Sequence, residues 1–136
     1  MAATTRQLGS SCETHGWKIE VRPEFLPEQS RADAEKYVFG YRVRITNNSP
    51  APATLVSRHW LIVDADGELH EVVGEGVVGH QPRLMPAQHF DYESFCPLST
   101  PWGTMEGTYL MRSDDDQQFT VKIGRFFLVA HEHVKS

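Results

Sequence analysis

Short runs in which apolar and polar residues alternate constrain the fold of this chain more than any other feature. The runs Trp17–Arg22 and Phe39–Ile45 show the alternation most clearly. Successive side chains of a β-strand point to opposite faces, so the pattern is typical of strands with one face in a core and the other in water. Turn-forming residues separate the runs, as at Asn47–Pro50 and Asp64–Gly67. The sequence therefore predicts antiparallel strands joined by turns.

About seven such strands are predicted. They are Trp17–Val21, Phe39–Ile45, Leu55–Val63, Leu69–Val73, Phe90–Ser94, Met105–Met111 and Phe119–Ile123, the last continued by Phe126–Val129 beyond a break at Gly124 and Arg125. No stretch of helical period is long enough to cover a sheet, and two sheets packed face to face bury the apolar faces of both. We expect an all-β, immunoglobulin-like sandwich of the fibronectin type III kind. A cysteine pair between its sheets is excluded, because neither Phe39–Ile45 nor Met105–Met111 contains cysteine.

Leu55–Val63 is the most continuously apolar run, so we expect it to be a central strand with Trp60 in the core. Strict alternation places Val56 and Trp60 on one face and Leu55 on the other. Asp64–Gly67 then predicts a hairpin to Leu69–Val73.

One domain is expected from 136 residues, covering residues 15–131 between a flexible leader (1–14) and a short tail (132–136). No apolar run approaches the roughly 20 residues of a membrane span, and the leader has no apolar signal segment. The two cysteines, Cys12 and Cys96, suggest reduced thiols, and we expect a cytoplasmic protein. The net charge of −5, with both signs interspersed, disfavours nucleic acid and anionic membranes as partners.

Gly74, Gly76 and Gly79 form a G-x-G-x-x-G motif. In a dinucleotide-binding fold this motif opens a helix, but Pro82 and Pro86 follow too closely for one. The motif therefore predicts a loop that needs glycines for positive φ, with an anion-binding nest of backbone amides as the functional alternative.

Metal-ligand patterns are weak. Asp64–Gly67 resembles a calcium loop only superficially, because its glycine is misplaced and its flanks are predicted strands. The seven histidines show no zinc spacing, and His131 and His133 lie near the chain end. We expect no metal site and no cofactor.

No catalytic constellation is apparent. His89 precedes Cys96 by seven residues, so on one strand the two side chains leave opposite faces. We interpret Cys96 as a small buried hydrophobe. Asp91 and Glu93 share a face, as expected of a solvated strand.

Two residues suit a partner surface. Trp102 follows the proline-containing segment Pro97–Pro101, where a held aromatic side chain loses little entropy on binding. Arg58 projects from the most apolar strand and offers a partner for a carboxylate or phosphate. The structural alternatives are Trp102 folded onto the sandwich end and Arg58 paired with a neighbouring glutamate.

The chain resembles the ApaG (CorD) family over about residues 17–131. The matching segments are Val21–Ser30, Leu55–Trp60, Asp64–Gly67, Gly74–Pro82, Cys96–Pro101 and Met105–Tyr109. The resemblance implies a fibronectin type III-like sandwich and a small bacterial cytoplasmic protein, often encoded beside a diadenosine tetraphosphatase. It also implies a genetic link to cobalt resistance and magnesium efflux, and protein binding as the role of related eukaryotic domains. It brings no catalytic residues, and it offers Gly74, Gly76 and Gly79 as a pyrophosphate site.

The leading hypothesis is a non-enzymatic module that binds a protein partner. The alternative is a protein that binds phosphate or pyrophosphate, with or without a divalent metal, through its glycine motif. An enzyme is the least favoured reading.

Overall fold

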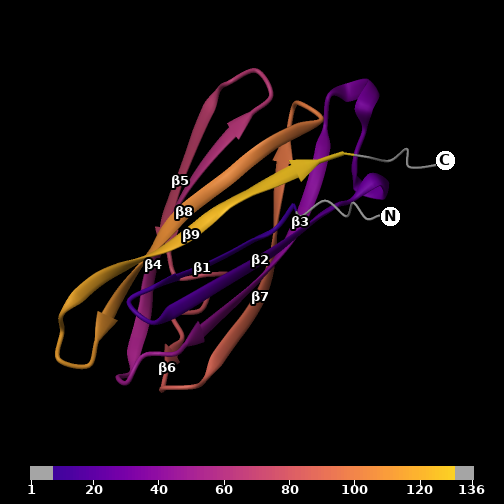
Figure 1. Cartoon of the computed structure of the whole chain (residues 1–136). Helices are drawn as coiled ribbons and strands as arrows, with labels where there is room; N and C mark the ends of the chain where they lie inside the picture. The colour runs from indigo at the N-terminus through magenta and orange to yellow at the C-terminus, as the bar shows by residue number, and fades with distance from the viewer. Residues whose placement is uncertain (1–7, 131–136) are drawn as a thin grey trace.

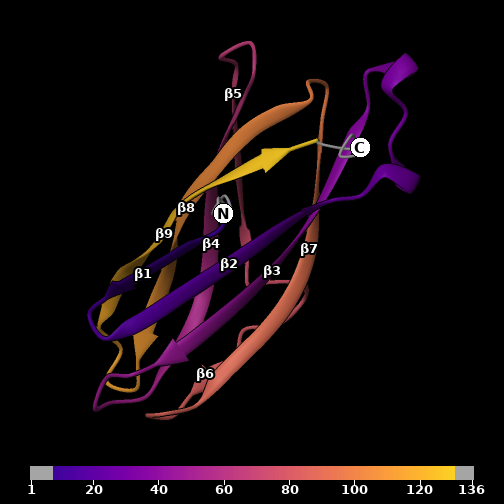
Figure 2. The same ribbon diagram turned by 45° about the vertical axis from the view of Figure 1, so that its right-hand side comes forward.

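Two antiparallel sheets pack face to face in the computed structural model, which describes residues 8–130 (Figures 1 and 2). The first sheet has the order β1-β2-β3-β7, and the second has the order β5-β4-β8-β9, with β6 also paired to β4. The strands are β1 (Ser10–Thr14), β2 (Trp17–Phe25), β3 (Tyr37–Asn47), β4 (Ala53–Asp64), β5 (Leu69–Glu75), β6 (Arg83–Leu84), β7 (His89–Leu98), β8 (Trp102–Ser113) and β9 (Gln118–Val129). The predicted β-sandwich is confirmed, and both described cysteines are free.

The alternating apolar residues of both sheets form one core between them. Trp60 lies at its centre, with its ring centroid 5.5 Å from that of Tyr41 and 5.8 Å from that of Phe126. Trp60 is therefore the core residue that the sequence predicts, and its strand β4 is central, between β5 and β8. Within residues 8–130, no helix is long and apolar enough to cross a membrane.

One lateral side of the sandwich is closed. β1 lies beside β9, where the Ser10 hydroxyl donates to the Gly124 carbonyl (2.8 Å) and the Lys122 N–H donates to the Thr14 hydroxyl (3.1 Å). The expectation of a flexible leader through Thr14 is wrong for residues 10–14, because they form a paired strand. The side chains with which β1 contacts β9 are polar, so the sequence shows no apolar alternation that would predict a strand there.

The opposite side of the sandwich is open. It is bordered by β5 and β7, the edge strands of the two sheets. No residue of β5 is buried, and its Val72 and Val73 are 40% and 71% exposed. Strand β5 therefore projects beyond the cover that the other sheet provides (Figure 1).

A β-bulge corrects the predicted faces of β4. The register with β8 shifts between Leu55 and Ser57, so Leu55 joins Trp60 in the core and Val56 is only half-buried. The extra residue of a bulge exchanges the inward-facing and outward-facing positions on its two sides. Strict alternation along the sequence cannot predict this exchange.

Other element boundaries also differ from expectation. The predicted runs Phe119–Ile123 and Phe126–Val129 form one strand, β9, and the break expected between them is a β-bulge, because Gly124 and Arg125 lie opposite the single residue Glu106 of β8. Two short 3-10 turns, Pro27–Gln29 and Ala32–Ala34, occupy the connection after β2. The predicted tail, with His131 and His133, lies outside the described residues.

Candidate functional site

Arg58 and the glycine motif, selected separately from the sequence, lie together. Gly74 is in β5 directly opposite Arg58 in β4. Nη1 of Arg58 donates to the carbonyl oxygens of Glu75 (3.0 Å) and Gly76 (2.9 Å). The arginine thus holds the chain where it leaves β5, and no carboxylate pairs with it among the described residues.

The rest of the glycine motif forms a tight turn. The N–H of Val77 donates to His80 C=O (2.8 Å) and the N–H of His80 donates to Val77 C=O (2.9 Å). Between them, Val78 (φ 43°) and Gly79 (φ 83°) both have positive φ, as the central residues of a type I′ turn require. Gly76 also has positive φ (64°), so two of the three glycines serve backbone conformations that other residues rarely adopt.

Several amides of this turn already have acceptors. The Gly76 N–H donates to Val56 C=O (2.8 Å), in addition to the paired amides of Val77 and His80. The Val77 side chain is fully buried and fixes the turn on the core. Among the amides of residues 76–80, those of Val78 and Gly79 have no backbone acceptor in the described part of the chain, and two amides are a small donor set for a phosphate nest.

A groove of about 540 Å³ lies at the open side of the sandwich. Its residues come from β3, β4, β5, β7 and β8, and the apolar ones include Tyr41, Trp60, Val72, Phe95 and Met105. Phe95, which is 61% exposed, has the outward-facing parity of β7 and borders the groove at its rim. The groove thus offers aromatic and aliphatic surface that no segment of residues 8–130 covers.

Charged groups mark the two ends of this groove. Arg58 lines one end, and Asp64 and His70 line the other. Arg58 and Asp64 both belong to β4, and the six residue steps of extended chain between them span roughly 20 Å. An occupant that reaches from one end to the other is therefore an extended molecule.

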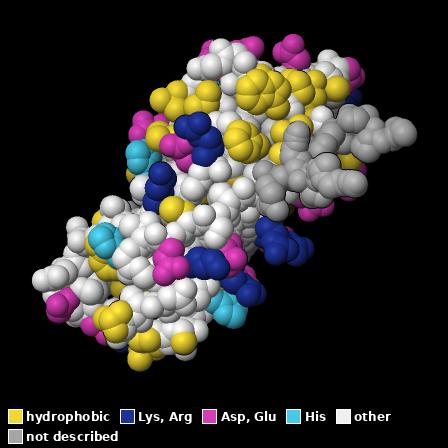
Figure 3. Space-filling view, viewed as in Figure 1, with side chains coloured by type: hydrophobic (Ala, Val, Ile, Leu, Met, Phe, Trp, Pro, Cys, Tyr) yellow, Lys and Arg dark blue, Asp and Glu magenta, His cyan; other side chains and the backbone are white. Residues whose placement is uncertain are grey.

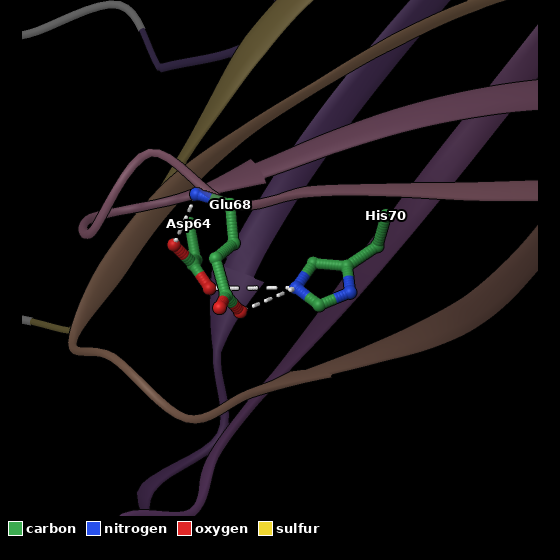
Figure 4. Close-up of side chains that lie close together, drawn as sticks. All are labelled: Asp64, Glu68 and His70. Atoms are coloured by element: carbon green, nitrogen blue, oxygen red, sulfur yellow. Dashed lines mark hydrogen bonds and ion pairs between the residues drawn. The ribbon is translucent and has the colours of Figure 1, made fainter.

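Asp64 organises the acidic end. Its Oδ1 accepts the N–H groups of Asp66 (2.9 Å) and Glu68 (3.0 Å), and its Oδ2 lies 3.4 Å from Nε2 of His70 (Figure 4). Burial of the side chain opposes ionisation. The N–H of Glu68, the His70 ring and the N–H of Asp66 outweigh that effect and lower the pKa of Asp64. The carboxylate therefore stays charged and caps the predicted hairpin turn.

Glu68 joins this cluster on its solvent side. One oxygen of its exposed carboxylate lies 3.8 Å from Nε2 of His70. Potential ligand atoms of Asp64, Glu68 and His70 fall within 4.8 Å of one another. Sequence spacing missed this convergence, because the hairpin brings together residues from both sides of its turn.

The thiol of Cys96 does not have the surroundings of a catalytic nucleophile. The residue is 5% exposed, and burial raises the pKa of its thiol to about 11. A nucleophilic cysteine needs the opposite shift, toward the thiolate. The interpretation of Cys96 as a buried hydrophobe is confirmed by its burial.

Trp102 lies apart from the groove. It is the first residue of β8 rather than part of the preceding loop, and it is 48% exposed. Phe127 and Leu69, 41% and 61% exposed, extend an apolar patch with it on the outer face of the second sheet. Figure 3 shows hydrophobic side chains gathered over β5 and the neighbouring ends of β8 and β9. The two predicted partner residues, Arg58 and Trp102, therefore belong to different surfaces.

Known proteins match nearly the whole chain. Residues 27–113 match the model of the ApaG domain. The chain is 53% identical over 120 residues to Protein ApaG of Anaeromyxobacter dehalogenans, covering 88% of this chain and 94% of that one. It is 47% identical over 113 residues to Protein ApaG of Chromobacterium violaceum, covering 83% and 90%. The crystal structure of the ApaA protein of Bordetella pertussis superimposes with a TM-score of 0.83 at 44% identity, covering 89% of this chain and 98% of that one. The chain belongs to the ApaG family.

Proposed function

We propose that this protein is a non-enzymatic interaction module that binds a segment of a partner protein in the groove between β5 and β7. The observation that carries the proposal is the uncovered strand β5, which leaves an apolar groove open at one side of an otherwise closed core. Exposed apolar surface of this kind is typical of interaction sites. Residues 8–130 offer no paired nucleophile and base that would favour an enzyme instead.

The surroundings of the groove support binding rather than chemistry. Its cysteine, Cys96, is protonated at neutral pH because burial raises the pKa of the thiol. The phenols of Tyr92 and Tyr109, which lie deeper in the core, hydrogen-bond each other, and burial raises the pKa of both. These groups hold their protons, as expected of structural residues.

A capture experiment tests the proposal. Phe95→Ser removes an exposed aromatic ring from the rim of the groove, and Phe127→Ser removes one from the outer face of the other sheet. Immobilised wild-type protein and both variants are incubated with lysate of the source cells, and the retained proteins are compared. We expect a partner that the wild type and Phe127→Ser retain and Phe95→Ser loses. Equal retention by all three proteins would contradict the groove as the binding site.

The alternative is binding of phosphate or pyrophosphate through the glycine motif. Within residues 76–80 it relies on the Val78 and Gly79 amides, together with Arg58, whose Nη1 is already bonded to backbone carbonyls. A titration with pyrophosphate followed by amide NMR tests it. Saturable shifts confined to residues 74–80 at micromolar ligand would favour this alternative over the protein-binding module.

Residence in the cytoplasm is part of the same proposal, since two free cysteines suit a reducing compartment. The link to cobalt resistance and magnesium efflux, which the family resemblance implies, stays a prediction.

A further inference from the structure

Sheet order leaves a vacant strand position in this sandwich. The first sheet ends at β7, whereas β5 of the second sheet extends past it without a strand opposite. A strand added along β7 would lie under the inner face of β5 and extend the core between the two sheets. Within residues 8–130, β7 pairs with β3 alone, so its other edge can accept such a strand as far as Pro97, which has no N–H to offer.

The charges at the two ends of the groove select the occupant. At one end, Arg58 hydrogen-bonds the described residues through Nη1, which leaves the N–H groups of Nε and Nη2 for an incoming carboxylate. At the other end, Glu68 is exposed beside Asp64 and His70. The surface between them is apolar, with Trp60 and Val72 at its centre.

We infer that the groove binds an extended segment of a partner protein as an added strand antiparallel to β7, with a basic side chain placed toward Glu68 and an acidic side chain toward Arg58. This inference rests on the proposed function. All strand pairs of both sheets are antiparallel, and antiparallel pairing is the slightly more stable form.

The direction of the segment follows from the direction of β7. This strand runs from Ser94, which like Arg58 lies close to Tyr41, to Leu98, whose side chain lies close to Gly103 and Asp64. An antiparallel neighbour runs the other way, so its basic residue precedes its acidic residue. Their separation matches the roughly 20 Å between the ends of the groove, or about six residues, and an even separation keeps both on one face.

Synthetic peptides test the inference. The probe is acetyl-Thr-Lys-Thr-Val-Thr-Ile-Thr-Glu-Thr-amide, whose Lys, Val, Ile and Glu share one face of an extended chain. The control exchanges Lys and Glu and keeps the composition. Binding to the full chain is measured by calorimetry at low salt. We expect the probe to bind at least about fivefold more tightly than the control, because both charged ends then meet opposite charge.

Variants of the protein locate the effect. Glu68→Lys, beside the groove residue His70, should remove the preference for the probe, whereas Glu28→Lys, which makes the same charge change on an exposed residue of the turn Pro27–Gln29, should keep it. Phe95→Ser should weaken probe and control alike, and Phe127→Ser should weaken neither. Circular dichroism confirms that each variant is folded.

The outcomes are distinguishable. Equal binding of probe and control, or no binding of either, would overturn the inferred strand chemistry. The proposed function would still stand if Phe95→Ser loses a partner from lysate. A dimer of the chain alone that Phe95→Ser dissociates in sedimentation would also overturn the inference, because a second copy would then occupy the groove.

Discussion

Arg58 occupies the space that a side chain on Gly74 would need, since a Cβ at residue 74 would lie 2.7 Å from Nη2 of the arginine. At Gly76 the obstacle is backbone instead, with the carbonyl oxygen of His80 2.3 Å from the position of a Cβ. Displacing the end of an arginine side chain costs little free energy, whereas displacing a backbone carbonyl held in a turn costs much more. The two glycines of one motif therefore have separable roles.

Alanine substitutions should separate these roles. Gly76→Ala places a Cβ against the carbonyl oxygen of His80, at a residue whose positive φ disfavours any side chain. We expect it to lower the free energy of unfolding by about 2 kcal/mol or more. Gly74→Ala should cost less than about 1 kcal/mol, because Arg58 can move, but it should disturb the bonds from Arg58 to Glu75 and Gly76. Chemical denaturation measures both. A larger loss for Gly74→Ala would contradict the assignment.

Val78→Asn should stabilise the protein. Val78 is 49% exposed and has φ 43°, a conformation that strains β-branched residues and suits asparagine at this position of a type I′ turn. We expect a gain of about 1 kcal/mol in the free energy of unfolding. A matched Val73→Asn change, at an exposed strand position, should give no such gain. Equal effects of the two substitutions would argue against turn strain.

Tyr109→Phe should destabilise the fold by about 1–2 kcal/mol, because it leaves the buried hydroxyl of Tyr92 without its hydrogen-bond partner. The double variant with Tyr92→Phe removes both hydroxyls and should recover much of that loss. A double-mutant cycle from denaturation curves checks this. Additive losses would show that the two phenols are not coupled.

The buried phenols of Tyr92 and Tyr109 should also make the protein less stable at alkaline pH. Burial raises the pKa of Tyr92 and of Tyr109 above the ordinary value of 10.0, so the folded state favours the neutral phenols. Their contribution to stability is present below that value and is lost as the pH rises toward the folded-state pKa. The melting temperature of the wild type should fall above pH 10 more steeply than that of the double phenylalanine variant. Parallel curves would contradict the prediction.

Cys96 should resist thiol reagents in the folded protein. It is 5% exposed with a thiol pKa of about 11, whereas Cys12 on β1 is only half-buried. A colorimetric thiol assay should therefore show one thiol reacting in buffer and two in denaturant. Cys12→Ser should abolish the reaction in buffer, and Cys96→Ser should leave it unchanged.

The lowered pKa of Asp64 implies that the folded protein loses stability in acid. Burial opposes its ionisation, but its bonds to Glu68, His70 and Asp66 lower its pKa below the ordinary 3.8. Such a carboxylate stabilises the fold above pH 3.8, and that contribution disappears as the pH falls through the folded-state pKa. Asp64→Ala should lower the melting temperature at neutral pH, and the difference from the wild type should shrink in acid. Asp66→Ala, whose side chain is exposed, is the control.

Alternation was sufficient to predict the sandwich, because most core strands place an apolar residue at every second position. It failed at β1, whose inward residues are Ser10, Cys12 and Thr14, and at Val56, where a bulge reverses the parity. The turn at Asp64 was predictable from its own residues. The groove was not, because it depends on which strands lie at the edges of the two sheets, and short-range pattern carries no information on strand order.

The glycine motif shows the same limit. Gly79 was expected to supply positive φ and does so. The role of Gly74 depends on Arg58, sixteen residues earlier in the chain and adjacent only through the pairing of β4 with β5. Sequence identified both residues as unusual, and their contact explains why.

The contact between β1 and β9 also determines where the chain enters and leaves the sandwich. The N–H of Phe127 donates to the carbonyl of Leu8, so both ends of the described chain emerge along one flank, opposite to β5 and β7. A fluorophore attached at Leu8 would accordingly lie beside β9, on the flank away from the groove between β5 and β7. Immobilisation through a residue at position 8 should therefore leave that groove accessible.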